Sequence, residues 1–329
     1  MHRTQPDNPE EFPMVDQQLV MVIGPRSADD QALIRAAAPD HRVEFVGSAA
    51  EAESLLPTAE VVAGTLTGAQ VRRASQLRWV HSWAAGANAD LSPEMVASPI
   101  VLTSSVGNGA VPLAEHALLL MIMLNRDVPR WIGAQAEHRW SRRTHGELVG
   151  STLGIVGLGH SGADLALKAR AFHMRVLGVR RRPDLAVPGV DAIYPRDRLE
   201  EFLAECDFVV VTAPMTPRTA GMFGAEQFAA MKPTAHWICI SRGGIADDDA
   251  LLAALQDGTI AGAGLDAHGV EPLPADSPFW DLPNVIITPH NGATTPGTVQ
   301  RGLEIFLDNL RRFVADEPLT NLVDKAAGY

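Results

Sequence analysis

Short apolar runs alternate with amphipathic stretches along the first third of the chain. The runs are rich in Val, Ile and Leu, which is typical of strands buried in a parallel sheet. They lie at 19–24, 43–47, 59–64, 77–83 and 100–105. Stretches with helical spacing, such as 29–38, lie between them. The alternation predicts a parallel sheet with covering helices.

A second alternating series follows a long apolar helix that begins near Ala114 and a polar stretch at 127–148. Its apolar runs lie at 152–157, 174–179, 207–213, 236–241, 260–266 and 284–290. They are typical of one doubly wound sheet. A final helix at 298–314 has no strand partner in this series, so we expect it to return to the first domain. The predicted domains are therefore 1–113 with 299–329, and 114–298.

Three glycines follow the first apolar run of the second series. Gly157, Gly159 and Gly162 separate that run from a helical stretch at 163–171. In a dinucleotide-binding turn, the first glycine permits a tight turn and the second lets the backbone approach a pyrophosphate. The third lets the helix pack closely on the strand. The strand before and the helix after favour this interpretation over a plain tight turn.

Composition and charge exclude several classes of protein. The chain has 329 residues and a net charge of −12, which argues against nucleic acid or an anionic membrane as a general partner. The longest strongly apolar run, 117–124, is far shorter than the ~20 residues of a membrane-spanning helix. Residues 1–13 are typical of a solvated leader, so we expect a cytoplasmic protein. Cys206 and Cys239, the only cysteines, are expected to be buried thiols, and no metal site is expected.

Chemically active side chains follow the strands of the second series. Arg242 follows the run at 236–241, Asp266 and Glu271 follow the next run, and His290 ends the last one. Ligands of open α/β sheets bind beyond the carboxyl ends of the strands. We therefore expect these side chains on one rim of the sheet.

Several ordered motifs together resemble the D-isomer-specific 2-hydroxyacid dehydrogenase family. They are AEHALLLMIMLNRDVPRW at 114–131, GLGHSG at 157–162, TAPMTPRT at 212–219, SRGGIADDDAL at 241–251 and GLDAHGVEPLPADSPFWDLPNVIITPH at 264–290. The resemblance covers most of the chain. It implies two Rossmann-like or flavodoxin-like α/β domains with parallel sheets and an active site in the cleft between them.

The resemblance also implies the site residues. Arg242, Glu271 and His290 would be the catalytic set, and Arg242 and His290 would also contact the substrate together with Ala85 and Gly86. The nucleotide would be bound by residues in and around the matching motifs, namely Gly157, Gly159, His160, Ser161, Gly162, Pro214, Thr219, Ile240, Ser241 and Asp266.

The chemistry of these side chains suits the reduction of a 2-keto acid. An imidazole titrates near neutral pH and can pass a proton to the keto oxygen, which is the role expected of His290. A carboxylate such as Glu271 orients the imidazole and favours its charged form. A guanidinium such as Arg242 offers paired donors to carboxylate and carbonyl oxygens.

Each of these residues has a structural alternative. His290 is one of 11 histidines and alone would be a loop or cap histidine. Arg242 would be a surface arginine, Glu271 a turn carboxylate and Asp266 a turn cap.

Basic residues stand where NAD enzymes place an acid. Arg180, Arg181 and Arg182 follow the second strand of the series, at the position of the ribose-binding carboxylate. We therefore expect NADP(H) to be preferred, with NAD(H) possible. The alternative is a solvated basic turn, with Asp184 binding the ribose.

Departures from the family pattern leave the substrate open. Ala87 and Asn88 replace a usual Val-Asp pair, His268 an aromatic residue and Cys239 an asparagine. Trp140 resembles a tryptophan that reaches a neighbouring active site in some relatives, or else it is buried in a helix interface. Relatives are usually dimers, so a homodimer is expected.

The leading hypothesis is a reductase that converts a small 2-keto acid, such as glyoxylate or hydroxypyruvate, to the D-2-hydroxy acid with NADPH. The alternatives are an NAD-dependent D-lactate or phosphoglycerate-type dehydrogenase, and a non-enzymatic NAD(P)-sensing protein similar to the corepressors of this fold.

Overall fold

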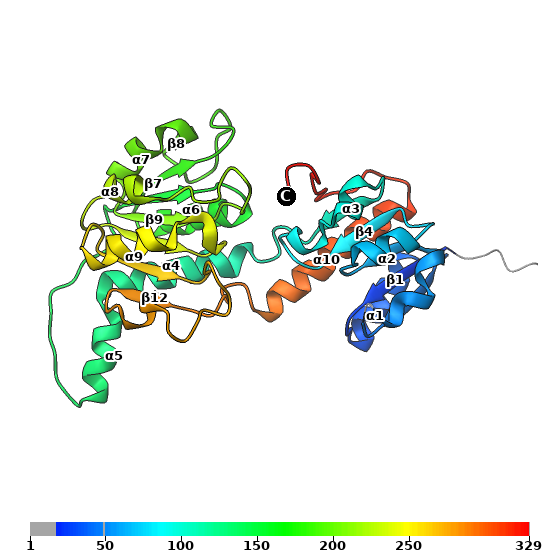
Figure 1. The fold of residues 1–329 in the computed structure, drawn as a ribbon, viewed down its shortest axis with the longest axis horizontal. Helices are drawn as coiled ribbons and strands as arrows, with labels where there is room; N and C mark the ends of the chain where they lie inside the picture. Colours follow the sequence, from blue (N-terminus) through cyan, green and yellow to red (C-terminus); the bar gives the residue numbers. More distant parts are fainter. Residues whose placement is uncertain (1–17, 49, 329) are drawn as a thin grey trace, which may run out of the picture. The chain divides into compact units, whose positions relative to one another are not determined.

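The computed structural model describes residues 18–48 and 50–328 (Figure 1). The leader at 1–13 lies outside the described residues. The chain divides into two compact units, one of Met1–Ser105 with Leu303–Ala326 and one of Val106–Gly302 with Ala327–Tyr329. The assignment of the first unit to the substrate stays a prediction.

The first unit has a five-stranded parallel sheet of order β2-β1-β3-β4-β5. Its strands are β1 (Leu19–Ile23), β2 (Arg42–Val46), β3 (Ala59–Ala63), β4 (Trp79–Ser82) and β5 (Val101–Ser104). Its helices are α1 (Ala28–Ala37), η1 (Glu51–Ser54), η2 (Leu56–Thr58), α2 (Gly68–Arg73), η3 (Asn88–Asp90), α3 (Pro93–Ala97) and most of α10 (Pro296–Val314).

Both faces of this sheet are covered. One face packs on a cluster that includes Val71 of α2 and Met95 of α3, and the other on Ile34 of α1 and Phe306 of α10. The α10 side chains pack here because Leu303, Phe306, Leu307 and Leu310 recur on one side of the helix. The final helix, which has no strand partner in the second series, therefore packs into the core of the first unit.

The second unit has a seven-stranded parallel sheet of order β12-β11-β10-β9-β6-β7-β8. Its strands are β6 (Thr152–Val156), β7 (Arg175–Val179), β8 (Ala192–Tyr194), β9 (Phe208–Val211), β10 (His236–Cys239), β11 (Gly262–Leu265) and β12 (Val285–Ile287). The six apolar runs predicted for this unit do not include β8, which is short and only half-buried.

Helices cover both faces of the second sheet as well. The helices are α4 (Ala110–Arg126), α5 (Val128–Ala136), α6 (His160–Ala171), η4 (Arg196–Arg198), α7 (Leu199–Glu205), α8 (Ala225–Ala229), η5 (Gly243–Ile245), α9 (Asp248–Gln256) and η6 (Pro278–Asp281). Side chains of α4 and α6 pack on one face, and those of α7, α8 and α9 on the other. The prediction of two α/β domains with parallel sheets is confirmed.

In the part of the chain that the structure describes, no helix has the length and apolar character needed to cross a membrane. Cys206 and Cys239 are both free and buried.

Candidate active site

The glycine turn has the geometry that a dinucleotide needs. Gly157 has a φ of 103°, and a Cβ there would lie 2.6 Å from Ala213 N. A Cβ on Gly162 would lie 2.2 Å from the carbonyl oxygen of Gly157, so only glycine lets α6 pack this closely. A Cβ on Gly159 would meet nothing within 4 Å, which leaves its backbone open to an incoming group. Three glycines therefore serve three different requirements.

The start of α6 suits an anion. Gly159 is the N-cap residue and offers no side-chain oxygen to the helix. Backbone N–H groups at such an end attract negative charge. His160 and Ser161, which open the helix, are exposed and half-buried respectively. The residues at this turn therefore fit a pyrophosphate.

The basic turn after β7 carries no acid at the position expected for NAD. Arg180 donates to the carbonyl oxygen of Leu185 at 3.3 Å. Arg181 and Arg182 are exposed, and so is Asp184. The turn offers positive charge to a phosphate at the surface.

Glu271 and His290 form a direct pair. Nδ1 of His290 lies 2.9 Å and 2.8 Å from the two carboxylate oxygens of Glu271. Because Glu271 engages Nδ1, Nε2 is the nitrogen left to exchange a proton with a ligand. About a third of each side chain remains accessible, 38% for His290 and 37% for Glu271.

Glu271 is held in its ionised form. Burial raises the pKa of its carboxyl group, but the His268 backbone N–H, which donates at 2.9 Å, and His290 lower it more. The net pKa of Glu271 is below the ordinary value. An ionised Glu271 accepts from His290 Nδ1 and so fixes which ring nitrogen faces it.

Asp266 organises the loop that carries His290. Its carboxylate is fully buried and accepts from Thr288 Oγ1 at 2.7 Å and from the backbone N–H groups of Asn291 and Gly292 at 3.0 Å each. His116 Nε2 of α4 lies 3.4 Å from the same carboxylate and 3.0 Å from Thr288 Oγ1. The loop on both sides of His290 is therefore tied to one buried charge.

The hydrogen bonds to Asp266 outweigh its burial. Burial raises the pKa of this carboxyl group, whereas His116, Thr288 and the two backbone N–H groups lower it, and the pKa lies well below its usual range. These donors belong to the protein itself, so a contact between Asp266 and the nicotinamide stays a prediction.

Arg242 follows β10 in a loop that packs on the Glu271 segment. Its Nη1 donates to the carbonyl oxygen of Ser241 at 2.7 Å, and Cys239 Sγ donates to the carbonyl oxygen of Arg242 at 3.2 Å. A Cβ on Gly243 would lie 2.0 Å from the carbonyl group of His268. The close packing at Gly243 joins the Arg242 loop to the segment that supports Glu271, although Arg242 makes its hydrogen bond to Ser241 rather than to the pair.

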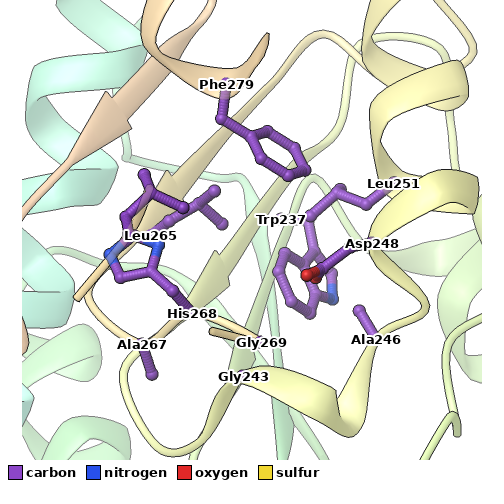
Figure 2. A pocket seen from close by; sticks show the side chains of 11 residues that line it. Trp237, Gly243, Ala246, Asp248, Leu251, Leu265, Ala267, His268, Gly269 and Phe279 are labelled. Carbon is purple, nitrogen blue, oxygen red and sulfur yellow. The ribbon is translucent and has the colours of Figure 1, made fainter. Parts of the chain in front are cut away.

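A small pocket lies behind these two loops. Figure 2 shows Trp237, Asp248, His268 and Phe279 around it. Its internal volume of about 20 Å³ is enough for a water molecule and too small for a keto acid. Arg242, Glu271 and His290 do not line it. The pocket therefore belongs to the packing of the loops that carry Arg242 and Glu271.

In the first unit, the predicted substrate loop follows β4. Ala84 and Ala85 are exposed and Gly86 is half-buried. The loop is fixed from below: Ser82 Oγ donates to the buried carboxylate of Asp90 at 2.5 Å, and Ser105 N–H donates to the carbonyl oxygen of Ala84 at 3.1 Å. The small side chains leave the backbone of this loop accessible.

The remaining predicted residues lie on loops after strands of the second unit. Pro214 and Thr219 lie after β9, and Thr219 Oγ1 donates to the carbonyl oxygen of Pro214 at 2.7 Å. Ile240, which is buried, and Ser241 follow β10. Trp140 is 91% exposed, so burial within this chain does not account for it.

The sequence alone did not predict the polar residues that hold the loops of the site in place. His116 contacts Thr288, far away in the chain, whereas Ser82 and Asp90 form a buried local contact. The available signal was a polar residue inside an otherwise apolar run, as with His116 in the helix at 114–126.

Comparisons with known proteins identify the family of this chain. The family model of the D-isomer specific 2-hydroxyacid dehydrogenase NAD-binding domain matches residues 118–292. A glyoxylate reductase of Korarchaeum cryptofilum is 35% identical over 77% of each chain. A glyoxylate/hydroxypyruvate reductase B of Yersinia enterocolitica is 35% identical over 82% of this chain and 83% of its own.

Solved structures extend the likeness over nearly the whole chain. A D-isomer specific 2-hydroxyacid dehydrogenase family protein from Aeromonas salmonicida superposes with a TM-score of 0.83 at 31% identity, covering 94% of this chain and 99% of that one. An NADPH-dependent glyoxylate/hydroxypyruvate reductase from Sinorhizobium meliloti, in complex with NADP and sulfate, gives 0.82 at 28% identity over 95% and 100%.

The chain belongs to the D-isomer specific 2-hydroxyacid dehydrogenase family. It is an NAD(P)-dependent dehydrogenase that acts on the CH–OH group of a 2-hydroxy acid. The family resemblance seen in the sequence is confirmed.

Proposed function

We propose that this protein reduces a small 2-keto acid, of the glyoxylate or hydroxypyruvate type, to the D-2-hydroxy acid and that it prefers NADPH. The observation that carries the proposal is the direct bond between Glu271 and His290, which leaves one imidazole nitrogen for proton transfer. The relatives named as glyoxylate and hydroxypyruvate reductases support the choice of substrate.

The proton comes from His290. In the direction of reduction, the protonated imidazole gives its Nε2 proton to the keto oxygen, while Glu271 holds Nδ1 and stabilises the charged form beforehand. In the reverse direction, the neutral imidazole takes the proton of the alcohol. The reduced nicotinamide, when bound, supplies the hydride to C2.

Arg242 and the loop after β4 position the acid. The guanidinium of Arg242 presents paired donors to the carboxylate and keto oxygens. The exposed backbone of Ala85 and Gly86 adds N–H donors for the carboxylate, and their small size lets it approach. Orientation of this kind accounts for much of the rate of such a reaction.

The nucleotide is held by the second unit. Gly157, Gly159 and Gly162, with the first residues of α6, take the pyrophosphate, and Pro214, Thr219, Ile240, Ser241 and Asp266 take the remainder of the nucleotide. Arg180 and Arg181 take the 2′-phosphate of NADP, since a cationic turn stands where NAD enzymes place an acid. The NADP-bound relative from Sinorhizobium meliloti supports this preference.

A panel of 2-keto acids assayed with both nicotinamides tests the proposal. We expect steady oxidation of NADPH with glyoxylate or hydroxypyruvate, and a lower kcat/KM with NADH. Binding of NADPH without turnover on any acid would instead identify a cofactor sensor.

The second candidate is a phosphoglycerate-type dehydrogenase. A D-3-phosphoglycerate dehydrogenase of Synechocystis is 35% identical over 68% of this chain, which spans only 41% of that protein. The panel therefore includes 3-phosphohydroxypyruvate, and pyruvate for the D-lactate alternative.

The proposal includes a homodimer in the cytoplasm. Three large apolar side chains, Trp131, Ile132 and Trp140, are exposed on and after α5 at 40%, 59% and 91%. Exposed apolar side chains of this size favour burial against a second copy of the chain. Two free cysteines fit a reducing compartment. Sedimentation at two protein concentrations tests the dimer.

A further inference from the structure

Arg26 lies at the carboxyl rim of the first sheet, near the substrate loop. It follows β1, whereas Trp83 follows β4, and β3 runs between these two strands. Gly64 follows β3 and carries no side chain, so nothing at that position separates Arg26 from Trp83. The guanidinium carbon of Arg26 lies 3.9 Å from the centre of the Trp83 ring.

The ring beneath the guanidinium is fixed from below. Trp83 packs edge-on against His81, with centroids 5.3 Å apart, and against Phe306 at 5.0 Å. His81 and Phe306 are fully buried. Arg26 therefore rests on a rigid aromatic support, and little freedom remains to be lost when its donors bind a ligand.

Arg26 forms no salt bridge in the described part of the chain, although burial lowers its pKa and the charge of Asp30 raises it in part. Its Nη1 donates to the carbonyl oxygen of Pro25 at 2.7 Å. The nearby carboxylate of Asp30 is engaged with the N-cap Ser27, whose backbone N–H lies 3.4 Å from it. A half-buried guanidinium that forms no salt bridge keeps donors for an external anion.

A second donor belongs to the ring that contacts Arg26. Trp83 Nε1 is buried and makes no hydrogen bond within the described residues. The neighbouring imidazole of His81 adds no charge, because burial lowers its pKa to about 3 and it is neutral at neutral pH. Arg26 is therefore the charged group at this point of the rim.

We propose that Arg26, resting on Trp83, binds a second anionic group of the substrate, so that the protein favours 2-keto acids with a carboxylate or phosphate attached to C3. This inference depends on the proposed function, in which the loop at 84–87 binds the first carboxylate. Trp83 is the residue directly before that loop, so Arg26 and the loop lie at the same end of the first sheet.

The test compares dianionic and monoanionic acids on wild type and on Arg26→Gln. The probes are oxaloacetate for a carboxylate, 3-phosphohydroxypyruvate for a phosphate and hydroxypyruvate as the monoanion. We expect Arg26→Gln to lower kcat/KM for the favoured dianionic acid by about 10- to 100-fold, as the loss of a charged hydrogen bond would. Hydroxypyruvate should change by less than about 3-fold.

Two variants control for other effects. Arg35→Gln removes a guanidinium that lies 4.8 Å from the Phe45 ring, from the last turn of α1, and should leave the ratio of dianion to monoanion unchanged. Arg26→Lys keeps the charge and should retain part of the preference. Thermal unfolding checks that Arg26→Gln is folded.

The outcomes separate the two proposals. The role of Arg26 is overturned if Arg26→Gln lowers kcat/KM equally for all three acids. It is also overturned if wild type reduces hydroxypyruvate but neither dianionic acid. Either result leaves the proposed reductase activity standing. If no 2-keto acid is reduced, the proposed function fails, and calorimetry of the NADPH-loaded protein decides the role of Arg26. The role of Arg26 is supported if wild type binds D-malate more tightly than D-glycerate and Arg26→Gln does not. It is refuted if wild type binds both acids equally.

Discussion

Replacing Glu271 with Gln removes the negative charge beside His290, the candidate proton donor, and keeps the shape of the side chain. The amide is nearly isosteric, so it can keep one hydrogen bond to His290 Nδ1, which lies 2.8 Å from the carboxylate. What disappears is the negative charge that favours the imidazolium. We expect the pH profile of kcat/KM for reduction to move toward acid, because the variant needs a higher proton concentration to charge His290.

The geometry sets the size of this shift. A hydrogen bond between charged groups contributes about 1.5–3 kcal/mol, whereas an exposed ion pair contributes about 0.2–1 kcal/mol. Both side chains are more than a third exposed, which places this pair between the two ranges, at about 1–1.5 kcal/mol. Since about 1.4 kcal/mol is tenfold, kcat/KM near neutral pH should fall by about 5- to 13-fold as the profile moves toward acid.

Initial rates of NADPH oxidation between pH 5 and 9 measure this shift, with the reactive acid held below its KM. Glu201→Gln is the matched control, because Glu201 pairs with Arg198 on the surface of the same unit and its loss should leave the profile unchanged. A Glu271→Gln profile that superposes on that of wild type would remove Glu271 from the mechanism.

Three further predictions follow from the buried supports and the nucleotide turn. Asp266→Asn should lower the free energy of unfolding by about 1–3 kcal/mol at pH 7, because the amide cannot accept from every donor around it. The pKa of Asp266 is depressed in the folded protein, so this stabilisation is present above its unfolded pKa of about 3.9 and is lost as the pH falls further. Urea unfolding should therefore show a smaller deficit at pH 3 than at pH 7, and an equal deficit at both would contradict this account. Gly162→Ala, whose Cβ would lie 2.2 Å from a carbonyl oxygen, should weaken NADPH binding or prevent folding, measured by fluorescence titration, whereas Gly133→Ala, whose Cβ would meet nothing within 4 Å, should leave NADPH binding unchanged. Changing Arg180 to Asp together with Arg181 to Ala should raise the Kd of NADPH far more than that of NADH, and similar increases for both would refute the phosphate assignment.

The sequence predicted the elements with strong periodicity and the residues at strand ends. Buried parallel strands such as Phe208–Val211 are continuous apolar runs, and the rule that ligands bind beyond their carboxyl ends led directly to Arg242, Glu271 and His290. The pairing of Glu271 with His290 is seen in the structure as the resemblance implied.

Contacts between distant segments could not be predicted in the same way. His116 reaches Asp266 and Thr288 across 150 residues or more of sequence, and no local pattern specifies this contact. Arg26 lies in a Gly-Pro-Arg-Ser turn that is typical of a helix start, and its position on Trp83 depends on the strand order of the first sheet. The short strand β8 was missed because three half-buried residues carry little periodic signal.

The transfer of a proton from His290 to the keto oxygen is tested by His290→Gln. We expect NADPH oxidation with the best acid to fall by at least about 100-fold, because a general acid contributes about 10²–10⁴-fold. The Kd of NADPH, measured by fluorescence, should stay within about 2-fold of wild type, since a change of that size is less than about 0.5 kcal/mol. Turnover close to that of wild type in a folded His290→Gln variant would contradict this role of His290.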